Sequence, residues 1–165
     1  MLPAQHTDWP ADGSAERIRF RLPLAEKDAL RIVTGVDYLA AHSRLHRCYP
    51  GGVLERRVEA SLALGQFMYF TDAAGVPVAF CNWAWVSEVV LSRVLAKDYD
   101  LAPGEFRCGP LPLLYEFLAP FGHCWRIARA LREMPAFAGR HIPCIRGRPW
   151  GEGPRSPRVH RFRFR

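Results

Sequence analysis

A histidine lies between two arginines in residues 43–50, with a serine three residues before it and a cysteine two residues after it. An imidazole has an unperturbed pKa of about 6.5, so it can accept a proton near neutral pH, where most other side chains cannot. His46 is therefore a candidate general base, and Ser43 carries a hydroxyl close to it in the chain. The alternatives are structural: His46 as a surface residue, and Ser43 as a helix or turn cap.

One carboxylate interrupts an otherwise apolar run at residues 113–118, which predicts a buried strand. Glu116 is a candidate partner for His46, because a carboxylate can fix the tautomer of an imidazole and stabilise its charged form. The alternative is a buried carboxylate that pairs with an arginine for structural reasons alone. A nucleophile made of Cys48 and His46 is a further alternative for the same segment.

Apolar spacing predicts the elements that must position these residues. A glycine turn at Gly122 precedes one of the helices, an arrangement that points free backbone N–H groups at an anion. We expect Trp125, Ala128 and Leu131 to share the apolar stripe of that helix. Residues 91–101 are ambiguous between helix and strand. The predicted helices are residues 25–42, 53–64 and 123–134, and the predicted strands are 66–70 and 76–85, joined by a turn at 72–75, then 113–118 and an edge strand at 159–165.

The length of 165 residues suits one domain with a substantial core. We expect a polar N-terminal leader at residues 1–25 and a single domain at 26–165. No apolar run reaches the roughly 18 residues that cross a bilayer. The five cysteines are odd in number and never form a C-x-x-C pair, which argues against a disulfide framework and a zinc site and favours a reducing, cytoplasmic location. No metal is therefore expected.

Positive charge is concentrated at the C-terminal end. Residues 1–139 are neutral overall, whereas residues 140–165 contain eight arginines and a single acidic residue, Glu152, and account for the net charge of +7. Such a segment predicts an acidic partner.

Three motifs occur in an order and at a spacing that resemble one known family. They are S-R-L-H-R at residues 43–47, V-A-F-C-N-W-A at 78–84 and F-L-A-P-F-G at 117–122. Together they resemble the lysine acyltransferases that activate RTX cytolysins, over roughly residues 36–165. The chain is identified as a divergent member of that family.

The resemblance implies a GNAT-like acyltransferase fold of the α/β (α+β) class, with a mixed, mostly antiparallel central sheet flanked by helices. It also implies a cytoplasmic protein, commonly a homodimer, that transfers a fatty acyl group from acyl carrier protein to a lysine of an RTX protoxin. No tightly bound cofactor is implied, since the acyl donor carries its own phosphopantetheine thioester. Acyl carrier proteins are acidic, so the resemblance implies one as the partner of the arginine-rich segment. No nucleic-acid partner is expected.

The family's catalytic residues fall on His46, Ser43 and Glu116, and the last position departs from the family's aspartate. A glutamate moves the carboxylate by more than an ångström, and misplacement on that scale can cost on the order of 10²-fold in rate. Asn82 replaces a motif serine. The backbone near Asn82 could stabilise the oxyanion, and the Gly122 turn could hold the phosphate of the acyl donor.

Two other functions remain open from the sequence. One is a GNAT-like acyltransferase with a different protein or small-amine acceptor. The other is a basic binding module that has lost catalysis.

Overall fold

The computed structural model describes residues 15–96, 99–146 and 158–163, with side chains described up to residue 144. In these residues the strands are β1 (Ala15–Ile18), β2 (Phe67–Asp72), β3 (Pro77–Val86), β4 (Leu111–Leu118), β5 (His141–Arg146) and β6 (Arg158–Arg163). The α-helices are α1 (Glu26–His42), α2 (Val53–Ala63), α3 (Glu88–Ala96) and α4 (Cys124–Arg132), and short 3-10 turns occupy His46–Cys48, Pro103–Phe106 and Pro135–Phe137.

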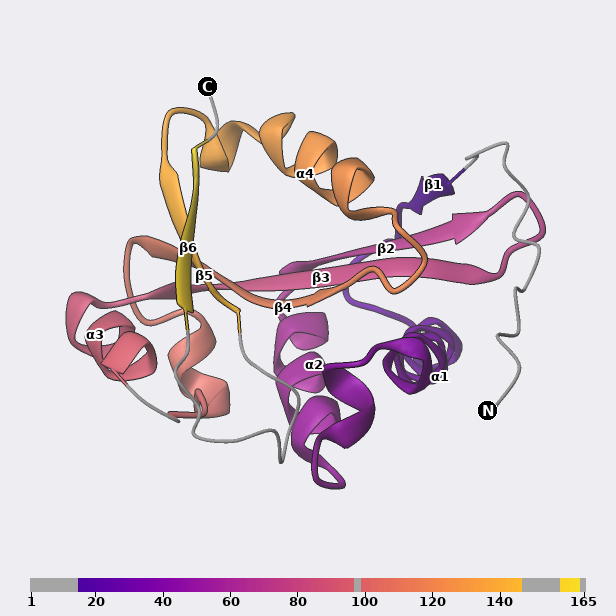
Figure 1. Cartoon of the computed structure of the whole chain (residues 1–165), viewed down its shortest axis with the longest axis horizontal. Helices are drawn as coiled ribbons and strands as arrows, with labels where there is room; N and C mark the ends of the chain where they lie inside the picture. The colour runs from indigo at the N-terminus through magenta and orange to yellow at the C-terminus, as the bar shows by residue number, and fades with distance from the viewer. Residues whose placement is uncertain (1–14, 97–98, 147–157, 164–165) are drawn as a thin grey trace, which may run out of the picture.

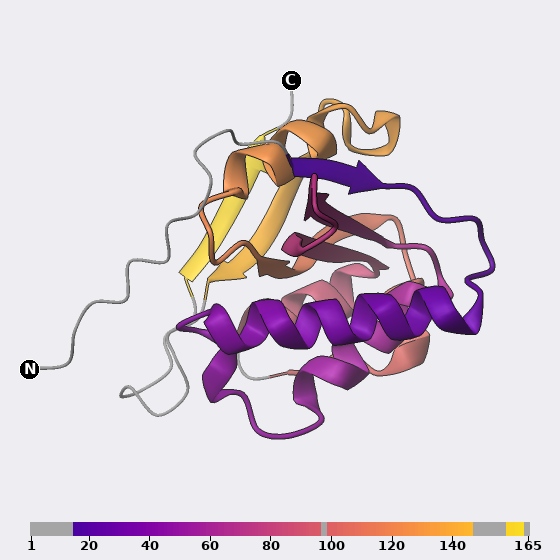
Figure 2. The same ribbon diagram turned by 90° about the vertical axis from the view of Figure 1, so that its right-hand side faces the viewer.

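The strands form one sheet in the order β1-β2-β3-β4-β5-β6. Neighbouring strands are antiparallel, except that β4 and β5 run parallel. Helix α4 lies over one face of the sheet, and α1 and α2 lie under the other (Figures 1 and 2). This architecture confirms the predicted α/β class with a mostly antiparallel central sheet flanked by helices, and it suits the GNAT-like arrangement.

Alternation along the strands builds a separate core on each face, because successive side chains of a strand point to opposite sides. On β2, Met68 and Phe70 pack in the core under α4, whereas Phe67 and Tyr69 pack against α1 and α2. On the next strand, Phe80 joins the α1 and α2 side. The sheet is thus buried on both faces at its centre, and polar groups that lie there must find partners within the protein.

The main predicted elements are present. The helices expected at residues 25–42, 53–64 and 123–134 correspond to α1, α2 and α4, and the hairpin corresponds to β2 and β3. The ambiguous segment contains most of α3, which begins at Glu88, earlier than the pattern indicated. The edge strand expected at 159–165 is β6. Among the described residues, we find no helix with both the length and the apolar character needed to cross a bilayer.

Two expectations were wrong. The leader was expected to extend to residue 25, but residues 15–18 form β1, which pairs with β2; residues 1–14 lie outside the described part. Trp125 was expected on the apolar stripe of α4, but it is 54% exposed, and Ile127 and Leu131 are the residues of α4 that pack on the sheet. In addition, residues 141–146, for which no element was predicted, form β5, where Ile142 is buried.

Gly35 lies in α1 directly against the buried ring of Tyr69, and a Cβ at this position would overlap the Tyr69 hydroxyl. We expect Gly35→Ala to lower the free energy of unfolding by about 1–2 kcal/mol. Overpacking a filled core costs about 1–3 kcal/mol, and overlap with the buried Tyr69 ring belongs to the upper part of that range, about 2–3 kcal/mol. The better helix propensity of alanine returns about 1 kcal/mol. Urea unfolding of this variant measures the change. Thr34→Ala, at the exposed neighbouring position, is the control, and a Gly35→Ala protein as stable as the wild type would contradict the expectation.

Candidate active site

His46 lies in the connection between α1 and α2, and the local sequence turns this connection back toward the sheet. Helix α1 ends at His42, because Ser43 adopts an extended conformation with φ of −93° and ψ of 121°. A 3-10 turn then begins at His46, and Gly52, with a φ of +76°, starts α2. A positive φ of this kind favours glycine. The result is a histidine that is only 5% exposed, although its segment is strongly basic.

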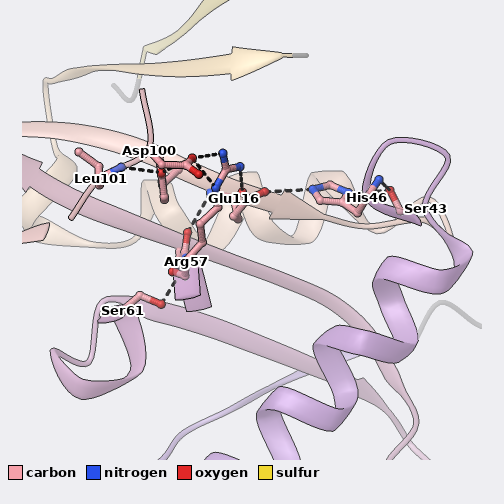
Figure 3. Close-up of polar contacts among 9 residues, drawn as sticks. Ser43, His46, Arg57, Ser61, Asp100, Leu101 and Glu116 are labelled. Carbon is pink, nitrogen blue, oxygen red and sulfur yellow. Dashed lines mark hydrogen bonds and ion pairs between the residues drawn. The ribbon is translucent and has the colours of Figure 1, made fainter. Parts of the chain in front are cut away.

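Both ring nitrogens of His46 are hydrogen-bonded, as Figure 3 shows. Nε2 lies 3.0 Å from Oε2 of Glu116, and Nδ1 lies 2.7 Å from Oγ of Ser43. An ionised carboxylate only accepts hydrogen bonds, so Nε2 carries the proton of the neutral ring. Nδ1 is then the basic nitrogen, and it accepts a hydrogen bond from the Ser43 hydroxyl. The structure therefore places the three predicted catalytic residues in one continuous chain of hydrogen bonds.

The Glu116 carboxylate is buried, and it is held from two sides. Oε1 accepts a hydrogen bond of 2.6 Å from Nη1 of Arg57, on α2, while Oε2 faces His46. Burial alone would raise the pKa of Glu116, but the hydrogen bond from His46 and the charge of Arg57 outweigh it and keep the pKa below its usual range. Glu116 is therefore ionised at neutral pH. It pairs with an arginine, as the structural alternative expected, and it also holds the candidate base.

The backbone beneath Glu116 is fixed by the side chain of Asn82, which is fully buried. Oδ1 of Asn82 accepts a hydrogen bond of 2.8 Å from the Glu116 amide. Nδ2 donates to the carbonyl of Arg57 at 2.9 Å and to Oγ of Ser61 at 3.0 Å. All polar atoms of the Asn82 side chain thus serve to join β3, β4 and α2. The asparagine orients the glutamate, and its predicted contact with the acyl donor, through the backbone nearby, stays a prediction.

A cleft of about 540 Å³ lies beside His46, between α1 and the start of α2. Its walls include the apolar side chains of Val33, Ala40 and Leu54, and Asp37 and Glu55 bring negative charge to it. Burial, together with the charge of Glu55, raises the pKa of Asp37. His46 is itself one of the residues that line the cleft.

The other residues singled out in the sequence lie elsewhere. Gly122 is exposed in the turn before α4, with a φ of +87°, and its role in holding the donor phosphate stays a prediction. The Cys48 thiol lies 3.9 Å from the carbonyl oxygen of Arg44, and the hydrogen-bonding partners of His46 are Ser43 and Glu116. His123, the residue just before α4, is buried.

Arg57 and Ser61 were not predicted as site residues, although a signal for them was present in the sequence. The buried face of α2 repeats at three- and four-residue spacing through Val53, Leu54, Val58 and Leu62. Arg57 and Ser61 belong to the same stripe. A charged residue at a core-facing position of a helix needs a buried partner, and Glu116 is the one the structure provides.

The chain is similar to known acyltransferases. The model of the RTX toxin acyltransferase family matches residues 25–163, most of the chain. The lysine-acyltransferase RtxC of Vibrio cholerae is 35% identical over 121 residues, which are 72% of this chain and 78% of RtxC.

Two further relatives match over a similar part of the chain. The protein-lysine palmitoyltransferase CyaC of Bordetella bronchiseptica is 32% identical over 124 residues, 73% of this chain and 66% of CyaC. The leukotoxin-activating lysine-acyltransferase LktC of a Pasteurella haemolytica-like species is 27% identical over 107 residues, 65% of this chain and 64% of LktC. The extent of the family match and the identity to RtxC show that this chain belongs to the RTX toxin acyltransferase family.

Proposed function

We propose that this protein transfers a fatty acyl chain from acyl carrier protein to an internal lysine of an RTX protoxin and so activates the toxin. The observation that carries the proposal is the buried chain Ser43–His46–Glu116 beside a cleft. The relatives named as lysine acyltransferases supply the substrate class. The match covers slightly less than two thirds of CyaC and LktC, so the acceptor and donor are part of the proposal.

The chemistry requires a base because a lysine amine, with an unperturbed pKa of about 10.4, is almost wholly protonated at neutral pH. In the proposed reaction Nδ1 of His46 takes a proton from the amine, either directly or through the Ser43 hydroxyl that now occupies this nitrogen. The neutral amine nitrogen bonds to the thioester carbonyl carbon, and the carbon–sulfur bond breaks. The leaving thiolate takes a proton from the imidazolium, and the remaining excess proton of the amine passes through the imidazole to solvent. Glu116 stabilises the imidazolium that forms.

Ser43 allows a second route through an acyl-enzyme. A hydroxyl that is hydrogen-bonded to a basic imidazole can itself attack a thioester. The two routes differ in one measurable way, since only the second adds the acyl mass to the protein before an acceptor is present. Intact-mass analysis after incubation with acyl carrier protein alone distinguishes them.

The charge distribution supports the choice of partners. Asp37 and Glu55 line the cleft, where they favour the approach of a cationic lysine side chain. The arginines of residues 140–165 are suited to an acidic carrier protein. An acyl carrier protein donor implies a cytoplasmic reaction, and a homodimer belongs to the same proposal, to be tested by light scattering.

The central test combines the purified protein with acyl carrier protein loaded with palmitate and an unacylated RTX protoxin. We expect mass spectrometry to find one or more acylated lysines in the protoxin, and none when the enzyme or the carrier is omitted. No transfer by a folded wild-type protein, with the protoxin or with lysine-containing protoxin fragments, would refute the proposed function.

A further inference from the structure

Arg57 lies on the far side of Glu116 from His46, and the two side chains share the carboxylate between them (Figure 3). One oxygen of Glu116 meets the imidazole and the other meets the guanidinium. A glutamate has one more rotatable bond than an aspartate, so a carboxylate held at only one oxygen would have more freedom to turn away. The contact with Arg57 removes that freedom at the position where this chain departs from the family's aspartate.

Arg57 is itself held in place. Asp100 accepts hydrogen bonds from Nε, at 2.9 Å, and from Nη2. The guanidinium carbon lies 5.3 Å from the ring centroid of Tyr49 and 5.2 Å from that of Tyr115, distances at which a cation is attracted to an aromatic face. The Tyr115 hydroxyl in turn donates to Asp100 over 3.2 Å. The guanidinium is therefore fixed by an ion pair and by two rings.

A β-bulge makes this arrangement possible. In a regular strand, the consecutive residues Tyr115 and Glu116 would point to opposite faces of the sheet. The pairing of β3 with β4 shifts register here, since Asn82 faces Glu116 whereas Trp83 faces Leu114. Tyr115 is the extra residue, and both it and Glu116 reach Arg57. Bulges of this kind often redirect a side chain at a functional site.

We propose that Arg57, held by Asp100, is a positioning residue that sets the orientation of Glu116 and the basicity of the pair formed by Glu116 and His46. This inference rests on the proposed acyl transfer. The positive guanidinium stabilises the ionised carboxylate and helps to keep the pKa of Glu116 low. Loss of Arg57 therefore has two consequences: the carboxylate is less well placed, and the pKa of Glu116 rises, so that the carboxylate takes up a proton at higher pH.

The test compares Arg57→Gln, Arg57→Lys and Asp100→Asn with Arg56→Gln, an exposed neighbour on α2 that serves as the matched control. We expect Arg57→Gln to lower kcat by roughly 10- to 100-fold with little change in KM. The acidic limb of its pH–rate profile should move to higher pH. Arg57→Lys should keep the acidic limb of the pH–rate profile near its wild-type position, because the lysine ammonium keeps the positive charge. It should recover only part of kcat, because an ammonium lacks the planar, multiple hydrogen-bond donors of a guanidinium. Asp100→Asn should give a smaller loss, and Arg56→Gln none.

A second measurement does not depend on turnover. The Nε2 proton of His46, hydrogen-bonded to Glu116, should give a downfield NMR signal that exchanges slowly with water. We expect Arg57→Gln to broaden or remove that signal and Arg56→Gln to keep it, with circular dichroism showing both proteins folded. If wild-type protein transfers no acyl group, the proposed function fails and the NMR comparison still decides the role of Arg57. An unchanged signal and an unchanged pH–rate profile in folded Arg57→Gln would overturn the inference.

Discussion

Replacing His46 with alanine is expected to lower the rate of acyl transfer by about 10²–10⁴-fold, the contribution typical of a positioned general base. The physical reason is that Nδ1 of His46 is the basic nitrogen, since Nε2 is occupied by Glu116, and that His46 lines the cleft. Without the imidazole, the acceptor amine loses its proton only to water. The measurement is kcat for protoxin acylation with palmitoyl-loaded acyl carrier protein, followed by mass spectrometry.

His42→Ala provides the matched control for this experiment. His42 is the last residue of α1, exposed, and its Nδ1 hydrogen-bonds to the backbone of its own helix at Tyr38. We expect it to retain most of the activity, and both variants should unfold at similar urea concentrations. Full activity in a folded His46→Ala protein would show that another group is the base and would remove the central residue of the proposed mechanism.

Substituting aspartate for Glu116 restores the residue that the family motif carries, yet we expect it to reduce kcat by on the order of 10²-fold. The side chain becomes shorter by one carbon–carbon bond, about 1.5 Å. The carboxylate of Glu116 now spans the gap between Nε2 of His46 and Nη1 of Arg57, with contacts of 3.0 and 2.6 Å. An aspartate on the same backbone, which Asn82 fixes, cannot keep both contacts.

Glu116→Gln separates the effect of charge from the effect of length. The amide keeps the size of the side chain but no longer stabilises an imidazolium, and it can present a donor to Nε2 and favour the wrong tautomer. We expect a loss on the order of 10³–10⁴-fold, as is typical when the carboxylate that orients a catalytic histidine is neutralised. The same acylation assay measures both variants. Wild-type kcat for Glu116→Asp would mean that β4 shifts to absorb the change, and wild-type kcat for Glu116→Gln would exclude Glu116 from the mechanism.

The elements that could be predicted are those whose signal is local. Helix α1, helix α2 and the β2–β3 hairpin follow from apolar spacing, glycines and turn residues within a few positions of one another. Strands β1 and β5 were missed for the opposite reason. Each is short, and each becomes a strand because a distant neighbour offers unpaired backbone groups: β2 for Ala15–Ile18, and β4 and β6 for His141–Arg146.

The residues of the candidate site also fall into two groups: those that local sequence indicates and those that only distant contacts bring in. Ser43 and His46 could be paired from their spacing, since three residues separate them, and the motif that contains Glu116 identified the third member. Nothing local indicates that Arg57, 59 positions before Glu116 in the chain, shares its carboxylate. The bulge that brings Tyr115 to the same guanidinium is a property of how β4 pairs with β3, and no pattern within β4 encodes it.

By itself, the sequence determined that this protein has a basic histidine segment, a buried carboxylate and the motifs of an acyltransferase. Residue type sets which protons can move, and short-range spacing sets which helix or strand carries each group. Only the tertiary structure decided that the Glu116 carboxylate reaches His46 from the position where the family motif has an aspartate. Its reach depends on Asn82 beneath the backbone and Arg57 beyond the carboxylate. Both are distant in the chain, and packing brings them together because a buried charge must have partners.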